Sequence, residues 1–297
     1  MRDISASPKI IEIKRKRRAR SLRIGILFFV IIIAVISTLA FFSNSKKMTI
    51  DTVVVEGNHI IDKDEIEKEV FNNIEGRYFY LFSKSNSLIY PREKVYNNLL
   101  LNFPRIETLS VERDNLKTLH INIVERVGSF LYCGNDIPGE KDKVGENCYF
   151  INNDGFIFDK APYFSGNVYF KYYTKLKDDM DPSGQQMIPV QDFYRITRFV
   201  DKITNLGLTP IYIVMNQEET NSLYLESKNN NITPKIIFKN NMDLDTIYEN
   251  LYLAMQKKEF TEEINLKYNK LLYIDLRFKN KVLYKFSIQG ESNSGEQ

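Results

Sequence analysis

The sequence predicts an α+β protein with a single transmembrane helix, followed by a small β-α-α-β-β module and a mixed β-sheet domain with flanking helices. Three observations lead to this prediction. Residues 24–42 contain no charged side chain, residues 48–126 contain two helical patterns between strand patterns, and residues 127–289 contain many short strand-like runs. Alternating apolar and polar side chains indicate strands, whereas apolar side chains at every third or fourth position indicate helices.

The apolar segment 24–42 has the length of a membrane-spanning helix. At about 1.5 Å per residue it would extend about 28 Å, close to the ~30 Å hydrocarbon core of a bilayer. The preceding residues 1–23 contain nine Lys and Arg residues against two acidic residues. Because an excess of Lys and Arg stays on the cytoplasmic side, residues 1–23 are predicted to be a basic cytoplasmic tail. The chain beyond residue 42 is then extracytoplasmic, the single-pass type II arrangement in the cell membrane.

Two other interpretations of the N-terminus stay open. A basic segment before an apolar core also describes a cleaved signal peptide, and the tripeptide TLA at residues 38–40 offers a small-x-small pattern. The apolar run continues through Phe41 and Phe42 and is longer than a usual signal core, which favours an anchor. The KRKRR run at residues 14–18 resembles a nucleic-acid patch, but its position beside an apolar span favours a topology signal.

The charge of the outer part argues against polyanion binding. The whole chain has a formal net charge of +3, and the tail alone contributes +7, so the remainder carries about −4. Binding to nucleic acids would favour a basic surface. The sequence therefore predicts no nucleic-acid partner for the extracytoplasmic part.

Residues 48–126 predict the small module. Asp62 is a good N-cap for a first helix, and Pro91 suits the first turn of a second helix. The two later strands alternate apolar and polar residues, so we expect both helices to cover one face of a small sheet. The expected elements are strand 50–55, helices beginning near Asp62 and Pro91, a loop over 78–87, and strands 106–113 and 119–124.

Residues 127–289 predict the larger domain. Amphipathic patterns predict helices over 191–206 and after Asp243. A hairpin around Lys279-Asn280-Lys281 closes the domain, and residues 290–297 have the composition of a disordered tail. The expected strands are 130–133, 148–152, 156–158, 168–173, 210–215, 222–226, 235–238, 271–278 and 282–288.

Cys133 and Cys148 are the two cysteines, and they bracket a polar, Gly-rich loop at 134–147. An extracytoplasmic location permits a disulfide, which would stabilise by about 3 kcal/mol for a loop of about 15 residues in the chain-entropy model. Two free thiols on adjacent strands are the alternative. A zinc site is not expected, because no histidine lies near the pair.

No pattern of catalytic residues is found in the sequence. The two histidines, His59 and His120, have no partners at a useful spacing, and phosphate-binding, nucleophile-elbow and metalloprotease motifs are absent. Asp275 is the carboxylate that comes closest to a catalytic candidate, although Arg277 projects to the same face of its strand and offers an ion-pair partner. We therefore expect no catalytic residue, metal, cofactor or small-molecule substrate.

Several motifs together resemble one family. They are Val55-Glu56-Gly57-Asn58 after the first strand, Asn-Phe-Pro-Arg-Ile at 102–106, Glu125-Arg126 after the last module strand, Asn-Asp-Gly at 153–155, and Tyr-Ile-Asp-Leu-Arg-Phe at 273–278. In this order the chain resembles the FtsQ/DivIB family of bacterial cell division proteins over nearly its whole length. Residues 48–126 resemble the POTRA domain of that family, and residues 127–289 resemble its β-rich domain. Leu116 and Gly128 stand where the family usually has proline.

The resemblance implies a function. It implies a non-enzymatic scaffold of the divisome, enriched at the division septum, that recruits FtsB/DivIC and FtsL through an edge strand. Two alternatives are a POTRA-containing module of envelope assembly or secretion and an anchored extracytoplasmic cell-wall enzyme. An alternative to partner binding is that the aromatic residues of the last hairpin fill the core of the domain. The partner-binding role is carried over to Arg277, Phe278, Val282, Leu283, Tyr284, Lys285 and Phe286.

Overall fold

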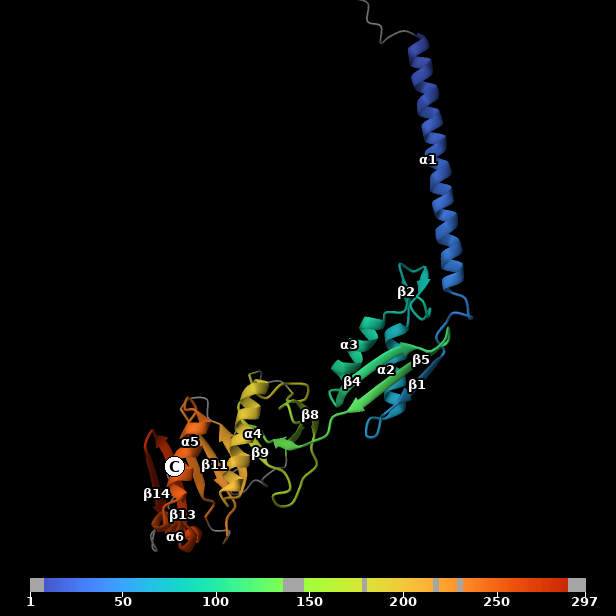
Figure 1. The fold of residues 1–297 in the computed structure, drawn as a ribbon. Helices are drawn as coiled ribbons and strands as arrows, with labels where there is room; N and C mark the ends of the chain where they lie inside the picture. Colours follow the sequence, from blue (N-terminus) through green and yellow to red (C-terminus); the bar gives the residue numbers. More distant parts are fainter. Residues whose placement is uncertain (1–7, 136–146, 178–180, 216–218, 229–231, 288–297) are drawn as a thin grey trace, which may run out of the picture. The chain divides into compact units, whose positions relative to one another are not determined.

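The computed structural model describes residues 8–135, 147–177, 181–215, 219–228 and 232–287 (Figure 1). The chain divides into two compact units, Met1–Glu125 and Arg126–Gln297, and each has its own hydrophobic core. The fold is mixed, with helices, a three-stranded sheet and a nine-stranded sheet. The predicted tail at 290–297 and most of the predicted loop at 134–147 lie outside the described residues.

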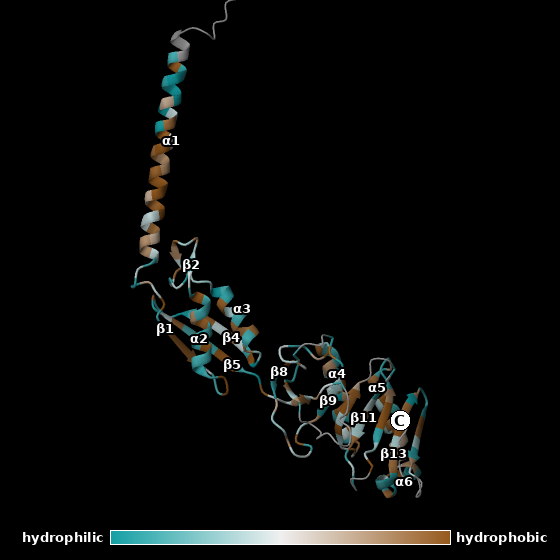
Figure 2. Ribbon diagram, turned by 180° about the vertical axis from the view of Figure 1, so that it is seen from behind, coloured by the Kyte–Doolittle hydropathy of each residue, from teal (hydrophilic) through white to brown (hydrophobic). Residues whose placement is uncertain are grey.

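The first element, α1 (Pro8–Ser43), contains one stretch long and apolar enough to cross a membrane. Figure 2 shows its first part as hydrophilic and its later part as hydrophobic. The helix begins well before residue 24, so the predicted basic tail is helical from residue 8 onward. Two causes account for this extension: Lys and Arg are good helix formers, and Glu12 and Lys16 form an i,i+4 ion pair of 2.8 Å.

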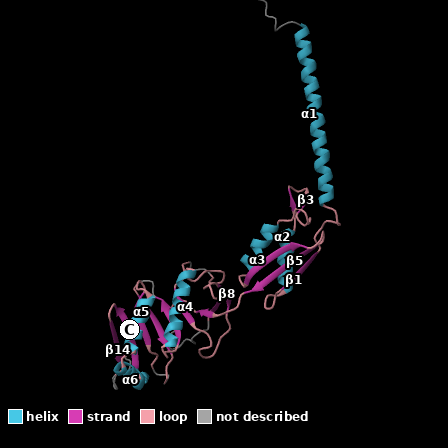
Figure 3. Cartoon of the chain, viewed as in Figure 1, coloured by secondary structure: helices cyan, strands magenta, loops and turns pink. Residues whose placement is uncertain are grey.

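The first unit contains a three-stranded sheet and two helices beyond α1 (Figure 3). The strand order is β1-β5-β4, with β1 parallel to β5 and β5 antiparallel to β4. Both helices bury apolar side chains against this sheet, and Ile66 and Leu99 are fully buried. The elements are β1 (Thr52–Glu56), α2 (Lys63–Ile74), β2 (Arg77–Tyr78), β3 (Phe82–Ser83), α3 (Arg92–Asn102), β4 (Ile106–Arg113) and β5 (Thr118–Glu125).

Glu125 ties the end of β5 to the turn before α2. Its carboxylate accepts hydrogen bonds from the backbone N–H groups of His59, Ile60 and Ile61 at 2.7, 2.9 and 3.0 Å. Partial burial alone would raise the pKa of Glu125, but these N–H groups outweigh it and lower the pKa. Gly57 precedes this turn with φ of +83°, and a Cβ there would lie 2.0 Å from the Ile123 carbonyl oxygen.

The second unit is built on the nine-stranded sheet, in the order β14-β13-β12-β11-β10-β9-β6-β7-β8. Its core buries Phe193 and Phe199 from α4 and Ile247 and Leu251 from α5. The elements are β6 (Phe130–Tyr132), β7 (Tyr149–Ile151), β8 (Ile157–Lys160), β9 (Lys171–Thr174), α4 (Val190–Asn205), β10 (Pro210–Met215), β11 (Thr220–Leu225), β12 (Lys235–Lys239), α5 (Leu244–Met255), α6 (Lys258–Leu266), β13 (Leu271–Phe278) and β14 (Lys281–Phe286).

Two elements depart from the sequence prediction. The segment 78–87, expected as a loop, contains part of the short antiparallel hairpin β2–β3. The helix α6 was not predicted, although Phe260 and Ile264 are four residues apart and both turn toward the core. A nine-residue helix offers only two such positions, which is too short a pattern to stand out from a loop.

Candidate functional site

The strand β14 lies at one edge of the nine-stranded sheet. Within the part of the chain that the structure describes, its sheet neighbour is β13, and nothing is paired with its other side. Such an edge presents a row of N–H and C=O groups to any extended chain that can add a strand. The predicted partner-binding residues lie on this edge hairpin, from Arg277 to Phe286.

The direction of the backbone groups along β14 follows from one hydrogen bond. The Ser287 N–H donates to the Lys270 carbonyl oxygen, on the side of β13, at 2.7 Å. Successive residues of a strand direct their N–H and C=O groups to opposite sides. The backbone groups of Val282, Tyr284 and Phe286 therefore point to the open edge, while those of the odd-numbered residues point to β13.

Tyr284 fixes the position of β14 against α6. Its hydroxyl donates to the Glu263 carboxylate at 2.6 Å, and its ring packs edge-on against Phe260 with the centroids 5.1 Å apart. Lys267 lies 2.7 Å from the other oxygen of Glu263. The hydrogen bond from Lys267 and then that from Tyr284 lower the pKa of Glu263, and the bond to Glu263 raises the pKa of Tyr284. These contacts hold the edge strand in a defined position against α6.

The apolar side chains of the hairpin fall into two groups. Val282 and Phe286 are half-buried and pack against the core of the unit, as the core-filling interpretation expected. Phe278 and Leu283 are 46% and 47% exposed, and Tyr284 is 36% exposed. The exposed group lies on the edge hairpin, where it is available for contact with another chain.

Arg277 is engaged with Asp275 on the same strand. Its Nε lies 2.9 Å from Oδ1 of Asp275, and its Nη2 lies 2.6 Å from Oδ2. Burial raises the pKa of Asp275, but the hydrogen bonds and charge of Arg277 outweigh burial and lower it. The side-chain hydrogen bond with Asp275 in turn raises the pKa of Arg277. Asp275, the carboxylate that came closest to a catalytic candidate in the sequence, is therefore one half of an ion pair.

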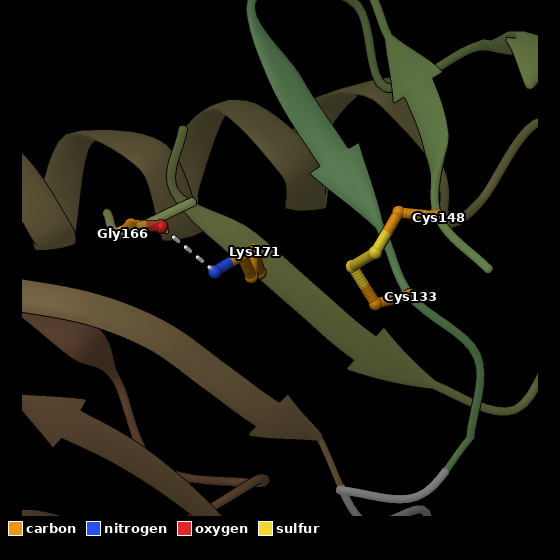
Figure 4. The surroundings of a disulfide bond; sticks show 4 residues. All are labelled: Cys133, Cys148, Gly166 and Lys171. Carbon is orange, nitrogen blue, oxygen red and sulfur yellow. Dashed lines mark hydrogen bonds between the residues drawn. A yellow bond between two sulfur atoms is a disulfide. The ribbon is translucent and has the colours of Figure 1, made fainter. Parts of the chain in front are cut away.

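Cys133 and Cys148, for which a bridge and two free thiols were both open, are joined by a disulfide (Figure 4). They follow β6 and precede β7, so the bond closes the base of the inserted segment between these strands. Cys148 is fully buried in a small cluster with Leu131 and Ala161. The bond therefore belongs to the packing of the unit, and it lies at the other end of the sheet from β14.

A groove elsewhere in the second unit was not predicted. It is lined by side chains near the start of α4 and around the ends of β9 and β10, among them Met187, Ile196, Met215 and Met242. Its lining includes Asp192 and Arg195, whose side chains approach to 3.5 Å, and contains no histidine or cysteine. The groove offers apolar contact area but no pair of groups suited to acid–base chemistry.

The described residues contain no group of three or more His, Cys, Asp or Glu side chains able to hold a metal ion. His120 lies 3.2 Å from the Glu56 carboxylate, and both are on the sheet of the first unit.

No protein-family model and no curated protein matches the chain.

Proposed function

We propose that the chain is a membrane-anchored scaffold of the bacterial divisome, of the FtsQ/DivIB type. In this proposal α1 crosses the cell membrane with the basic end in the cytoplasm, and the chain beyond α1 is extracytoplasmic and enriched at the septum. The first unit acts as a POTRA domain, which its β-α-α-β-β order supports once the short β2–β3 hairpin is set aside. The second unit recruits FtsB/DivIC and FtsL.

One observation carries the proposal: among the described residues nothing pairs with the outer edge of β14, to which the N–H and C=O groups of Val282, Tyr284 and Phe286 are directed. A partner strand pairing there would obtain affinity from main-chain hydrogen bonds and specificity from the exposed Phe278 and Leu283. Tethering to the membrane confines the protein and its partners to one plane, which raises their effective concentration.

The test uses a matched pair of substitutions at one position. Tyr284→Pro removes the outward N–H together with the ring, whereas Tyr284→Val removes the ring and keeps the N–H. The full-length protein in detergent is used to capture a tagged extracytoplasmic segment of the FtsB/DivIC partner. We expect Tyr284→Pro to abolish capture and Tyr284→Val to retain most of it.

Equal capture by the wild type and both variants would refute pairing through this edge. Depletion in cells separates the proposal from its two rivals. Filaments without septa support the division role, defects in envelope assembly support the assembly module, and altered wall digestion supports the enzyme.

A further inference from the structure

The hairpin β2–β3 exposes two aromatic side chains at a strained turn. Phe79 and Tyr80 have φ of +48° and +62°, and the Leu81 N–H donates to the Tyr78 carbonyl oxygen at 3.0 Å. Turns with two central residues of positive φ normally contain Asn and Gly, because bulky side chains disfavour that region. Phe79 is 87% exposed and Tyr80 is 92% exposed. Neither residue type suits a turn that faces water.

The hairpin is fixed against the C-terminal end of α1. The Ser83 N–H donates to the Ser43 hydroxyl at 3.1 Å, and the Asn44 side-chain amide donates to the Leu81 carbonyl oxygen at 2.9 Å. The side-chain amide of Asn86, which is buried, donates to the Ser43 carbonyl oxygen at 3.0 Å. These bonds join Ser43, the last residue of α1, and Asn44 after it to the tip and the β3 side of the hairpin (Figure 3).

The tip of the hairpin lies beside the apolar part of α1. A shallow groove is lined by Ser37, Ala40 and Phe41 from the helix and by Tyr80 and Leu81 from the tip. Ser37 precedes the last apolar residue of the helix by five positions, which is about 8 Å along the axis. A bilayer that surrounds the apolar segment would therefore reach the tip.

We propose that the hairpin tip Phe79–Tyr80–Leu81 inserts into the outer interface of the bilayer that α1 spans. Aromatic side chains concentrate at this level of a membrane, because their rings are apolar and their polar edges stay near water. Arg77 lines the same groove, and Lys46 and Lys47 are exposed just beyond α1, where cations meet lipid headgroups. The first unit then contacts the membrane at two points, which limits its swing about the end of α1. This inference depends on the membrane anchoring proposed above.

The protein contains no tryptophan, so one introduced tryptophan reports on its own position. The full-length chain is reconstituted into vesicles of phosphatidylcholine and phosphatidylglycerol whose acyl chains carry bromine, a quencher, either near the carbonyl or near the chain end. Tyr80→Trp and Phe79→Trp probe the tip, and Ile31→Trp probes the centre of the apolar segment. Leu101→Trp, at a position 75% exposed near the end of α3, serves as the water-exposed control.

We expect both tip variants to lose most of their emission, with bromine near the carbonyl quenching more strongly than bromine near the chain end. Ile31→Trp should show the reverse order, and Leu101→Trp should keep its emission. Unquenched tip variants alongside a quenched Ile31→Trp would overturn the inference and leave the anchor intact. An unquenched Ile31→Trp would overturn the anchoring proposal, and the inference with it.

Discussion

Arg277 forms a bidentate ion pair with Asp275, two residues earlier on β13, and this pair lies directly beside the proposed partner-binding edge. The two ends of the pair differ in environment. The Asp275 side chain is 5% exposed, whereas that of Arg277 is 41% exposed. Removing Arg277 therefore leaves a buried carboxylate without its counter-ion, whereas removing both side chains leaves no unpaired charge.

We expect Arg277→Ala to lower the free energy of unfolding of the second unit by about 1–3 kcal/mol, the range for an unsatisfied buried polar group. The double variant Asp275→Val/Arg277→Ala should recover part of this loss. Urea unfolding of the wild type, both single variants and the double variant measures the coupling. Additive single effects would show that the two side chains do not stabilise one another.

The same pair predicts a dependence on pH. Because the folded pKa of Asp275 is lowered, its contribution to stability is complete above the unfolded pKa of about 3.9. It is then lost as the pH falls through the lower folded pKa. The stability difference between the wild type and Asp275→Asn should stay constant from neutral pH to about 5 and shrink below about 3.9. A difference that grows on acidification would contradict the assigned sign.

Replacing Phe79 and Tyr80 is predicted to raise the stability of the first unit, whereas most substitutions lower it. Phe79→Asn/Tyr80→Gly supplies residues that tolerate positive φ, so the first unit should gain about 1 kcal/mol in detergent solution. The control is Lys68→Gly, an exposed position in the middle of α2, where glycine should lower the stability by about 0.5–1 kcal/mol. Thermal unfolding of the purified full-length chain checks both. Loss of stability in the double variant would mean that the aromatic rings hold the hairpin together.

The helix α3 offers a matched pair for the core of the first unit. Leu99 is fully buried and Leu101 is 75% exposed, two residues later on the same helix. Leu99→Ala should lower the free energy of unfolding by about 2–5 kcal/mol, and Leu101→Ala should change it by less than about 0.5 kcal/mol. Similar effects from the two substitutions would contradict the orientation of α3.

The disulfide predicts a loss confined to the second unit. Cys133→Ser/Cys148→Ser should lower the stability of that unit by about 3 kcal/mol, the chain-entropy value for a loop of about 15 residues. Limited proteolysis can follow the two units separately, and cleavage of the first unit should be unchanged. An equal increase in proteolytic cleavage of both units would show that the disulfide stabilises more than the second unit.

The sequence predicted those elements whose local pattern and tertiary environment agree. The alternation in β5 has one buried face, and Asp62 and Asp243 cap α2 and α5 through their side chains as their positions indicated. The hairpin β2–β3 was not predicted, because its turn carries Phe79 and Tyr80, residue types that seldom form such turns. Its stabilising contacts with the end of α1 are also distant in sequence.

The edge hairpin was predicted as a pair of strands, but the orientation of its side chains was not. An irregularity between Asp275 and Phe278 shifts the register of β13 against β14. This irregularity leaves the alternation of β14 intact, which puts Leu283 and Phe286 on opposite faces. Alternation alone did not show which of these two faces packs on the core.

The central claim is that β14 pairs with a partner strand through its free edge. Hydrogen exchange of individual amides in the full-length protein, with and without the FtsB/DivIC segment, measures this pairing directly. The account predicts that the partner slows exchange at Val282, Tyr284 and Phe286, while Leu283 and Lys285, whose N–H groups already face β13, change little. Unchanged exchange at the three outward N–H groups in a saturated complex would contradict it.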